Sequence, residues 1–199
     1  MVKTTNKKTA VVVGGSSGIG FETCKRLVNR GWNVVNVSRT NCKAAKVTNI
    51  KADAADGEAL KNAIKKSAGK NGISLLIYSA GFSMAAPIEY AKEEDYKYLF
   101  EVNFFGALRA IQYAIPYMKN KGGRIILIGS LGGDLPISFD SFYSSSKAAL
   151  EMLCRSAYSE LKPYNIKVTG VLPGGTSTGF TFKRKVYSIF NLTFPFCTP

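Results

Sequence analysis

The sequence predicts a doubly wound α/β domain built on a parallel sheet of about six strands. Two observations indicate this fold class. Short, almost uninterrupted apolar runs alternate along the chain with longer amphipathic stretches, and a glycine-rich turn directly follows the first apolar run. Continuous apolar runs are typical of strands that helices bury on both faces. Because the 199 residues contain no repeat and no linker, we expect a single domain over residues 1–199.

The expected strands and helices alternate along most of the chain. Predicted strands cover residues 9–13, 33–38, 47–52, 73–78, 123–129 and 166–172. Predicted helices follow the first strand up to about residue 30 and then cover about 56–70, 93–119 and 143–162. The helix over 56–70 has its apolar residues on one face and lysines on the other, as expected for a helix that covers a sheet.

The turn after the first strand has the composition of a phosphate-binding loop. Its residues are Gly14, Gly15, Ser16, Ser17, Gly18, Ile19 and Gly20, which gives the spacing G-x-x-x-G-x-G. Glycines let the backbone approach a pyrophosphate, and the N-terminus of the following helix offers free N–H groups. Because the turn lies between a strand and a helix, it predicts that the chain binds a dinucleotide.

The end of the second strand indicates which dinucleotide is bound. Ser38 and Arg39 stand about where the ribose would lie. An acidic residue there would bind the 2′-hydroxyl group and repel a 2′-phosphate, whereas the planar guanidinium of arginine matches phosphate oxygens. The sequence therefore favours NADP(H) over NAD(H). The alternative is an exposed arginine without a ligand.

Tyr143 and Lys147 are the candidates for chemistry. They are four residues apart on a predicted helix, so both side chains can point into one pocket. A fixed positive charge next to a phenol lowers its pKa and makes it a better acid or base at neutral pH. Ser130 directly follows a predicted strand, and ligands of open parallel sheets bind beyond the carboxyl ends of the strands. Ala80 and Gly81 follow another strand, where small residues suggest a close approach to a ligand.

Composition excludes several other classes of site. The chain has no histidine, so no mechanism with a histidine base or metal ligand applies. The four cysteines have no CxxC spacing, which argues against a zinc site and favours reduced thiols in the cytoplasm. No apolar run approaches the roughly 20 residues needed to span a bilayer.

The net charge of +14 raises the question of an acidic partner. Nucleic acid, an anionic membrane, an acidic protein or a phosphorylated ligand could each exploit it. The lysines are scattered, however, and no nucleic-acid-binding motif is present, so a general solubility charge is the simpler interpretation. We expect no nucleic-acid partner.

These motifs resemble the short-chain dehydrogenase/reductase family over about residues 8–180. The resemblance rests on the glycine-rich turn and on Asp53, Ala80, Gly81, Asn103, Ser130, Tyr143, Lys147, Pro173, Gly174 and Thr178. It implies a Rossmann-type sheet and a nicotinamide cofactor. It also implies a tetrad of Asn103, Ser130, Tyr143 and Lys147, with Asp53 at the adenine and Thr178 at the nicotinamide. The remaining matched residues, together with Tyr143 and Lys147, would line the cofactor site.

The resemblance also assigns roles to the tetrad. Tyr143 would protonate the alkoxide that hydride transfer creates, or remove the proton in the oxidative direction. Lys147, with the positively charged oxidised nicotinamide, would lower the tyrosine pKa and would bind the nicotinamide ribose. Ser130 would hydrogen-bond the carbonyl oxygen. Asn103 would hold a water that links Lys147 to solvent.

The chain departs from the family pattern in three respects. Val13 replaces the usual threonine, and Tyr78 and Ser79 replace the usual asparagine pair. We expect the family's last strand to be missing, since family members usually continue for about another 50 residues. Residues 180–199 are interpreted as a shortened substrate lid with an apolar wall of Phe180, Phe182, Phe190 and Phe194, as an element that contacts a membrane or partner, or as the result of truncation.

Two hypotheses for function follow. The first is an NADPH-dependent reductase of ketones or aldehydes, reversible as an alcohol dehydrogenase. Its candidate substrates are 3-oxoacyl thioesters, steroids and small carbonyl compounds. The second is a regulatory NADP(H)-binding protein that has lost catalysis with its C-terminal segment. We expect a homodimer or tetramer formed through the helices at about 93–119 and 142–163.

Overall fold

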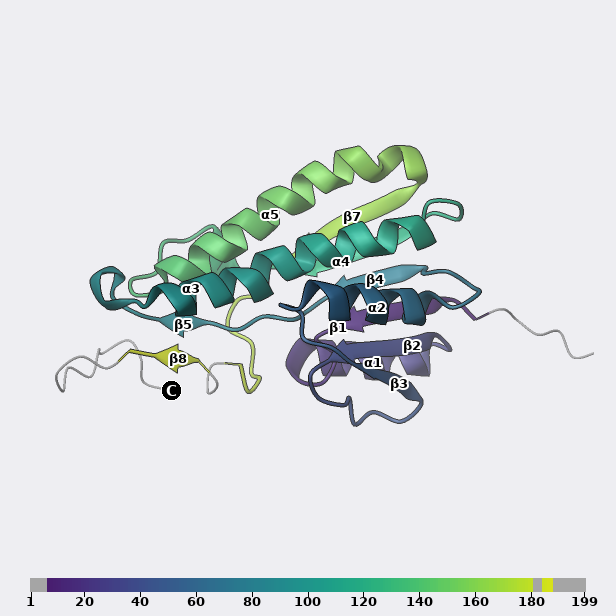
Figure 1. Cartoon of the computed structure of the whole chain (residues 1–199), viewed down its shortest axis with the longest axis horizontal. Coiled ribbons are helices and arrows are strands. Elements are labelled where there is room, and N and C mark those ends of the chain that lie inside the picture. The colour runs from purple at the N-terminus through teal and green to yellow at the C-terminus, as the bar shows by residue number, and fades with distance from the viewer. Residues whose placement is uncertain (1–6, 181–183, 188–199) are drawn as a thin grey trace, which may run out of the picture.

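The computed structural model describes residues 7–180 and 184–187, and its centre is a six-stranded parallel sheet (Figure 1). The strand order is β3-β2-β1-β4-β6-β7. The strands are β1 (Thr9–Val13), β2 (Asn33–Ser38), β3 (Val47–Lys51), β4 (Leu75–Tyr78), β6 (Gly123–Ile128) and β7 (Ile166–Val171). The chain moves outward from β1 to β3, returns to the centre at β4 and then moves outward to β7. The doubly wound sheet predicted from the sequence is therefore confirmed.

The central strands are apolar because both of their faces are covered. All of β1 is buried, and Val11 lies opposite Val35 of β2 and Leu76 of β4. Val11 and Val13 belong to the core on one face, whereas Ala10 and Val12 belong to the core on the other. Successive side chains of a strand point to opposite faces, so a strand between two helical layers must be apolar throughout.

Helices are distributed unequally over the two faces of the sheet. Apolar side chains of α2 (Gly57–Ala68), α4 (Gly106–Ala114) and α5 (Ser141–Leu161) share one core with the sheet. Among the described helices, α1 (Gly18–Asn29) packs against the other face, where Cys24 and Phe21 meet β1 and β2. None of the described helices is long and apolar enough to cross a membrane.

The predicted helical region over 93–119 is confirmed, since helical residues run without a break from Glu93 to Tyr117, but the region is not one regular α-helix. The segment consists of α3 (Glu93–Phe100), a π turn (Glu101–Phe105), α4 and a short 3₁₀ turn (Ile115–Tyr117). In the π turn the Gly106 N–H bonds the carbonyl of Glu101, five residues back. Pro116 has no N–H group, so the regular α-helical pattern cannot continue through it.

A second, two-stranded sheet was not predicted. In it β5 (Met84–Ala85) pairs in parallel with β8 (Lys185–Val186). The Lys185 N–H donates to the Ser83 carbonyl at 3.2 Å and the Tyr187 N–H donates to Ala85 at 3.0 Å. Ion pairs of Lys185 with Asp95 and of Arg184 with Asp140 reinforce the pairing.

Of the four phenylalanines predicted to form an apolar wall, the structure describes one. Phe182, Phe190 and Phe194 lie outside the described residues, whereas Phe180 is described and half-exposed. At the edge of the six-stranded sheet, β7 alternates between buried and exposed residues over its first half and is exposed thereafter.

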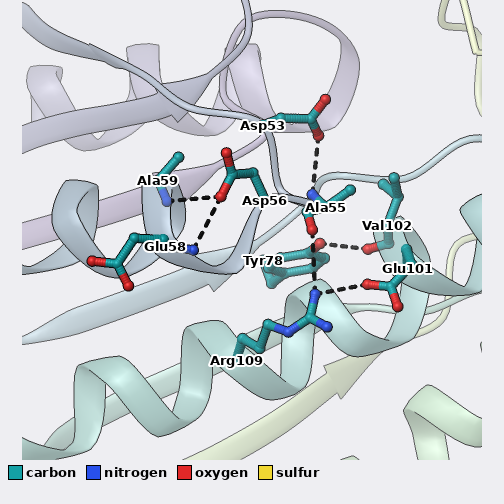
Figure 2. A network of polar contacts seen from close by, with 9 residues as sticks. All are labelled: Asp53, Ala55, Asp56, Glu58, Ala59, Tyr78, Glu101, Val102 and Arg109. Atoms are coloured by element: carbon teal, nitrogen blue, oxygen red, sulfur yellow. Dashed lines mark hydrogen bonds and ion pairs between the residues drawn. The ribbon is translucent and has the colours of Figure 1, made fainter.

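Asp56 caps α2 and provides a test of local stability. Its side chain accepts hydrogen bonds from the N–H groups of Glu58 and Ala59 at 3.1 and 3.0 Å (Figure 2). We predict that Asp56→Ala lowers the free energy of unfolding by about 1 kcal/mol, because two N–H groups of the first turn lose their acceptor. Thermal denaturation measures this loss. Asp56→Asn keeps an acceptor and serves as the control; an equal loss in both variants would contradict the capping role.

Candidate active site

A cleft of about 860 Å³ lies at the carboxyl ends of the strands and extends across the point where the strand order reverses. Almost every residue predicted for the cofactor or for chemistry lines it. These residues are Gly14, Ser16, Ser17, Gly18, Ile19, Ser38, Arg39, Asp53, Ala80, Gly81, Ser130, Tyr143, Lys147, Pro173, Gly174 and Thr178. Gly20 and Asn103 lie behind the wall of the cleft. The topology therefore gathers in one place residues that are more than 160 positions apart in the sequence.

Two glycines of the glycine-rich turn, Gly14 and Gly20, are packed so closely that no side chain would fit. Gly14 has a φ of +86°, and a Cβ atom there would lie 2.4 Å from the Ala80 nitrogen. A Cβ on Gly20 would lie 2.2 Å from the Gly14 carbonyl oxygen. Gly20 therefore contributes through packing, by letting α1 pass close to the turn.

The N-terminus of α1 suits the pyrophosphate of a dinucleotide. Ser17 is the N-cap, but its side chain makes no capping hydrogen bond, and the first turn has no acidic residue. Ser17, Gly18 and Ile19 line the cleft, so the first N–H groups of the helix can meet a ligand there. The partial positive charge of a helix N-terminus favours an anion at this position.

A buried polar network holds the loop that carries Arg39. Asn36, in the middle of β2, is fully buried; its amide accepts from the Ser38 hydroxyl at 2.7 Å and donates to the Thr40 carbonyl at 3.3 Å. Asn36 also donates to Asn49 on β3 at 2.9 Å. An asparagine inside an apolar strand is the sequence signal for this network, which was not predicted.

Arg39 lies at the entrance of the cleft opposite Asp53. Its guanidinium is largely exposed, donates to the Tyr98 hydroxyl at 3.2 Å and is 3.9 Å from the Asp53 carboxylate. The other Asp53 oxygen accepts from the Ala55 N–H at 3.0 Å (Figure 2). Tyr98 was not predicted as a site residue, because a tyrosine on an exposed helix face has no distinctive sequence pattern.

Tyr143, Ser130 and Lys147 meet at the other end of the cleft. Tyr143 and Lys147 are buried on α5, at 9% and 4% exposure. The Lys147 ammonium donates to the Ile128 carbonyl at the end of β6, at 2.9 Å, and is 5.8 Å from the centre of the Tyr143 ring. Among the described residues no carboxylate pairs with Lys147.

Burial governs the protonation of this pair. It raises the pKa of Tyr143 above its ordinary value, and a hydrogen bond with Ser130 opposes the rise in part. Burial also lowers the pKa of Lys147 to about 8. The prediction that the positive charge of Lys147 lowers the pKa of Tyr143 is therefore wrong for the protein groups alone, because burial of the hydroxyl outweighs it.

Asn103 is fully buried in the π turn and bridges three elements. Its amide nitrogen donates to the Phe82 carbonyl and to the Ser146 hydroxyl, both at 3.0 Å, and its oxygen accepts from the Phe82 N–H at 3.1 Å. Ser146 in turn donates to the Tyr143 carbonyl at 2.7 Å. Both amide protons of Asn103 are therefore used, and one lone pair of its side-chain oxygen is left for a water.

The wall of the cleft opposite the glycine-rich turn is formed by residues 173–180. The Leu131 N–H donates to the Pro173 carbonyl at 3.1 Å, and Thr178 faces Gly18. The Phe180 ring lies 6.0 Å from the Tyr143 ring. Phe82 and Lys185 also line the cleft, and neither was predicted to do so. Among the described residues no group of three or more acidic, cysteine or histidine side chains could hold a metal ion.

The order of the strands, with Ser130, Tyr143 and Lys147 gathered at their carboxyl ends, identifies the class of protein to which the chain belongs. The chain belongs to the short-chain dehydrogenase family, whose model matches residues 8–186.

The relatives include enzymes from bacteria, archaea and fungi. The chain is 34% identical to the 3-ketodihydrosphingosine reductase of Bacteroides thetaiotaomicron, over 88% of this chain and 66% of that protein. It is 30% identical to the NADPH-dependent 1-acyldihydroxyacetone phosphate reductase of Saccharomyces cerevisiae, over 93% and 67%. The structure of Thermoplasma acidophilum aldohexose dehydrogenase matches with a TM-score of 0.82 and 28% identity, over 88% of this chain and 69% of that chain. The chain thus spans about two thirds of the length of its curated relatives.

Burial of the Lys147 ammonium should make the free energy of unfolding depend on pH. Its pKa falls from 10.5 to about 8 on folding, so the buried charge costs about 3 kcal/mol below pH 8, and this cost disappears as the pH rises to about 10.5. We predict that Lys147→Met, without nucleotide, is more stable than wild type by about 1–3 kcal/mol at pH 7, since the hydrogen bond to Ile128 is lost at the same time. Denaturant titrations between pH 6 and 10.5 measure the difference. A difference that does not shrink above pH 8 would contradict this assignment.

Proposed function

We propose that this protein is an NADPH-dependent reductase that transfers a hydride to a ketone borne by a long acyl or alkyl chain. The observation that carries the proposal is the arrangement at the inner end of the cleft. There the buried Tyr143 lines the cleft together with Ser130, and the Lys147 ammonium is held beside the Tyr143 ring by the Ile128 carbonyl at the end of β6. The entrance of the same cleft carries Arg39.

The side chains present suit the protonation of a carbonyl oxygen. Bound NADPH would supply the hydride to the carbonyl carbon. Tyr143 gives its proton to the oxygen, and the raised pKa of its hydroxyl keeps that proton in place at neutral pH. Lys147, with a pKa of about 8, is cationic at neutral pH and stabilises the phenolate left behind. Ser130 donates a hydrogen bond to the same substrate oxygen. In our proposal Asn103 holds a water between Lys147 and solvent.

The cofactor would be held along the whole cleft. The N–H groups at the start of α1 bind the pyrophosphate, and Asp53 lies at the adenine end. Lys147 reaches the nicotinamide ribose with its remaining protons, and Thr178 lies at the nicotinamide end. Arg39 is the group that would recognise a 2′-phosphate, because its guanidinium is exposed at the cleft entrance. An NADPH-dependent relative supports this preference.

Apolar groups surround the catalytic end of the cleft. Phe82 and Phe180 line it. Leu131 is half-exposed beside Gly174, and Leu135 and Ile137 are exposed on the following loop. Exposed apolar side chains beside a cleft form a surface that an apolar ligand can cover. The two curated relatives are named for a ketosphingoid base and an acylated ketone, which supports a lipid-like ketone, including a 3-oxoacyl thioester, over a small sugar.

We further propose a cytoplasmic homodimer. Cys24, Cys42 and Cys154 are free thiols, as expected in a reducing compartment. Phe105, Met152 and Tyr158 are exposed around α4 and α5, and a second copy of the chain would cover them.

The enzyme assignment is tested with a panel of carbonyl compounds. We expect oxidation of NADPH, followed by its absorbance, with long-chain 3-oxoacyl thioesters and acylated ketones, and slower turnover of short-chain analogues. Tyr143→Phe should lower kcat by about 10²–10⁴-fold, because the proton donor is lost, with NADPH binding retained. NADPH binding by wild type without turnover of any compound would reject the reductase and leave a nucleotide-binding protein.

The cofactor preference is tested at Arg39. We predict that Arg39→Ala weakens NADPH binding by about 10-fold or more, because a charge-assisted contact to the 2′-phosphate is lost, and changes NADH binding less than twofold. Fluorescence titration measures both dissociation constants. Arg30→Ala removes an equal charge at the far end of α1 and should change neither constant. Equal weakening of NADPH and NADH in Arg39→Ala would refute the assignment.

A further inference from the structure

Tyr78 ends β4 and sends its side chain toward the helix that carries Asn103. It is fully buried, and its hydroxyl donates to the Val102 carbonyl at 2.5 Å, across 24 positions of sequence (Figure 2). Burial raises the pKa of this hydroxyl well above its ordinary value, so it stays protonated and keeps the proton that it donates to Val102. The sequence showed Tyr78 as a departure from the family pattern, and the proposed function gives it no role.

Val102 belongs to the π turn, where a helix contains one residue more than its hydrogen-bonding pattern requires. Turns of this kind are rare in helices, and a side chain that bonds a carbonyl of the turn can support one. The Tyr78 hydroxyl gives such support, since it bonds a carbonyl inside the turn. Space for it comes from Gly106, where a Cβ atom would lie 2.3 Å from the Tyr78 oxygen.

A second contact holds the other side of the same turn. The Arg109 guanidinium pairs with the Glu101 carboxylate at 2.7 Å and donates to the Ala55 carbonyl at 3.3 Å (Figure 2). Glu101 begins the turn, so the turn is held at one residue by Arg109 and at the next by Tyr78. The Arg109 pair is partly exposed to solvent, whereas the Tyr78 bond is fully buried and is therefore the stronger constraint.

The residue after Val102 is Asn103, which reaches Tyr143 through one intermediate side chain. Asn103 donates to the Ser146 hydroxyl at 3.0 Å, and Ser146 donates to the Tyr143 carbonyl at 2.7 Å. Asn103 also fixes the backbone of Phe82, just past Gly81 at the floor of the cleft. The Lys147 ammonium lies close to Gly81, 3.5 Å from where a Cβ atom on that glycine would stand. A change in the π turn is therefore transmitted to Lys147 from two sides, through the Phe82 backbone and through Tyr143.

We propose that Tyr78 is a positioning residue for the reaction: its hydroxyl fixes the π turn, and through Asn103 and Ser146 it sets the Tyr143–Lys147 pair against the floor of the cleft. The proposal rests on the proposed function for its catalytic consequence. Its structural part, control of the π turn by one hydroxyl group, stands independently of any substrate.

The test is Tyr78→Phe, which removes one oxygen and keeps the ring in the core. We expect backbone amides of residues 103–107 to exchange with deuterated solvent about 10-fold faster, because the turn has lost its internal tether. We also expect kcat to fall about 5- to 20-fold, whereas KM and the dissociation constant for NADPH change less than twofold. Hydrogen-exchange mass spectrometry and steady-state kinetics measure these effects.

Ser67→Ala is the matched control. The Ser67 hydroxyl is also buried and also donates to a helix carbonyl, that of Ala63 at 2.7 Å, but it lies on α2 away from the π turn. Its loss should destabilise the fold to a similar degree without changing exchange at 103–107 or kcat. A general loss of stability would thus affect both variants, and a positioning effect only Tyr78→Phe.

The outcomes separate this inference from the proposed function. Unchanged exchange at 103–107 in Tyr78→Phe would overturn the inference, whatever the activity. Faster exchange with an unchanged kcat would overturn the catalytic part. If wild type reduces no carbonyl compound, the proposed function fails, and the exchange measurement together with the NADPH dissociation constants still decides whether Tyr78 controls the turn.

Discussion

The close approach of Gly14 to Ala80 is the constraint on which the rest of the site depends. A Cβ atom at Gly14 would overlap the backbone at the end of β4, so the cofactor turn and the segment after β4 pack as one unit. That contact lies at the point where the strand order reverses, and a parallel sheet leaves its ligand site there. The positions of the α1 N-terminus and of the cleft floor both follow from it.

The catalytic end of the cleft is held together by polar groups that would be costly to bury alone. Asn103, Ser146 and Lys147 are all buried, and each has partners that fix its position. A buried polar group without partners costs about 1–3 kcal/mol or more, so each of these groups restricts its neighbours. Lys147 differs from the other two because it is charged, and its ammonium bonds a carbonyl but pairs with no carboxylate among the described residues. Part of the stability of the fold is therefore given up at the residue that the proposed chemistry requires.

The sequence predicted those features that depend on local pattern. Five-residue apolar runs such as β1 are long enough to show burial on two faces, and the glycine-rich turn, Arg39 and the Tyr143–Lys147 pair follow from spacing along one element. The π turn could not be predicted, because it depends on a hydroxyl 24 positions away that bonds Val102. The β5–β8 pair was missed because strands of two residues have no periodicity. The roles of Asn36 and Tyr98 depend on neighbours from other elements, which a single sequence does not reveal.

The contact of Tyr78 with Gly106 limits which residues can stand together at these two positions. With 2.3 Å between the tyrosine oxygen and the position of a Cβ on residue 106, a tyrosine at 78 is compatible with glycine there and with no larger residue, unless the backbone moves. The same Cβ position lies 2.7 Å from the Ala54 carbonyl oxygen, so a side chain at 106 would also press on the backbone just before α2. Glycine at 106 therefore lets the π turn, the end of β4 and the segment before α2 come together at one point.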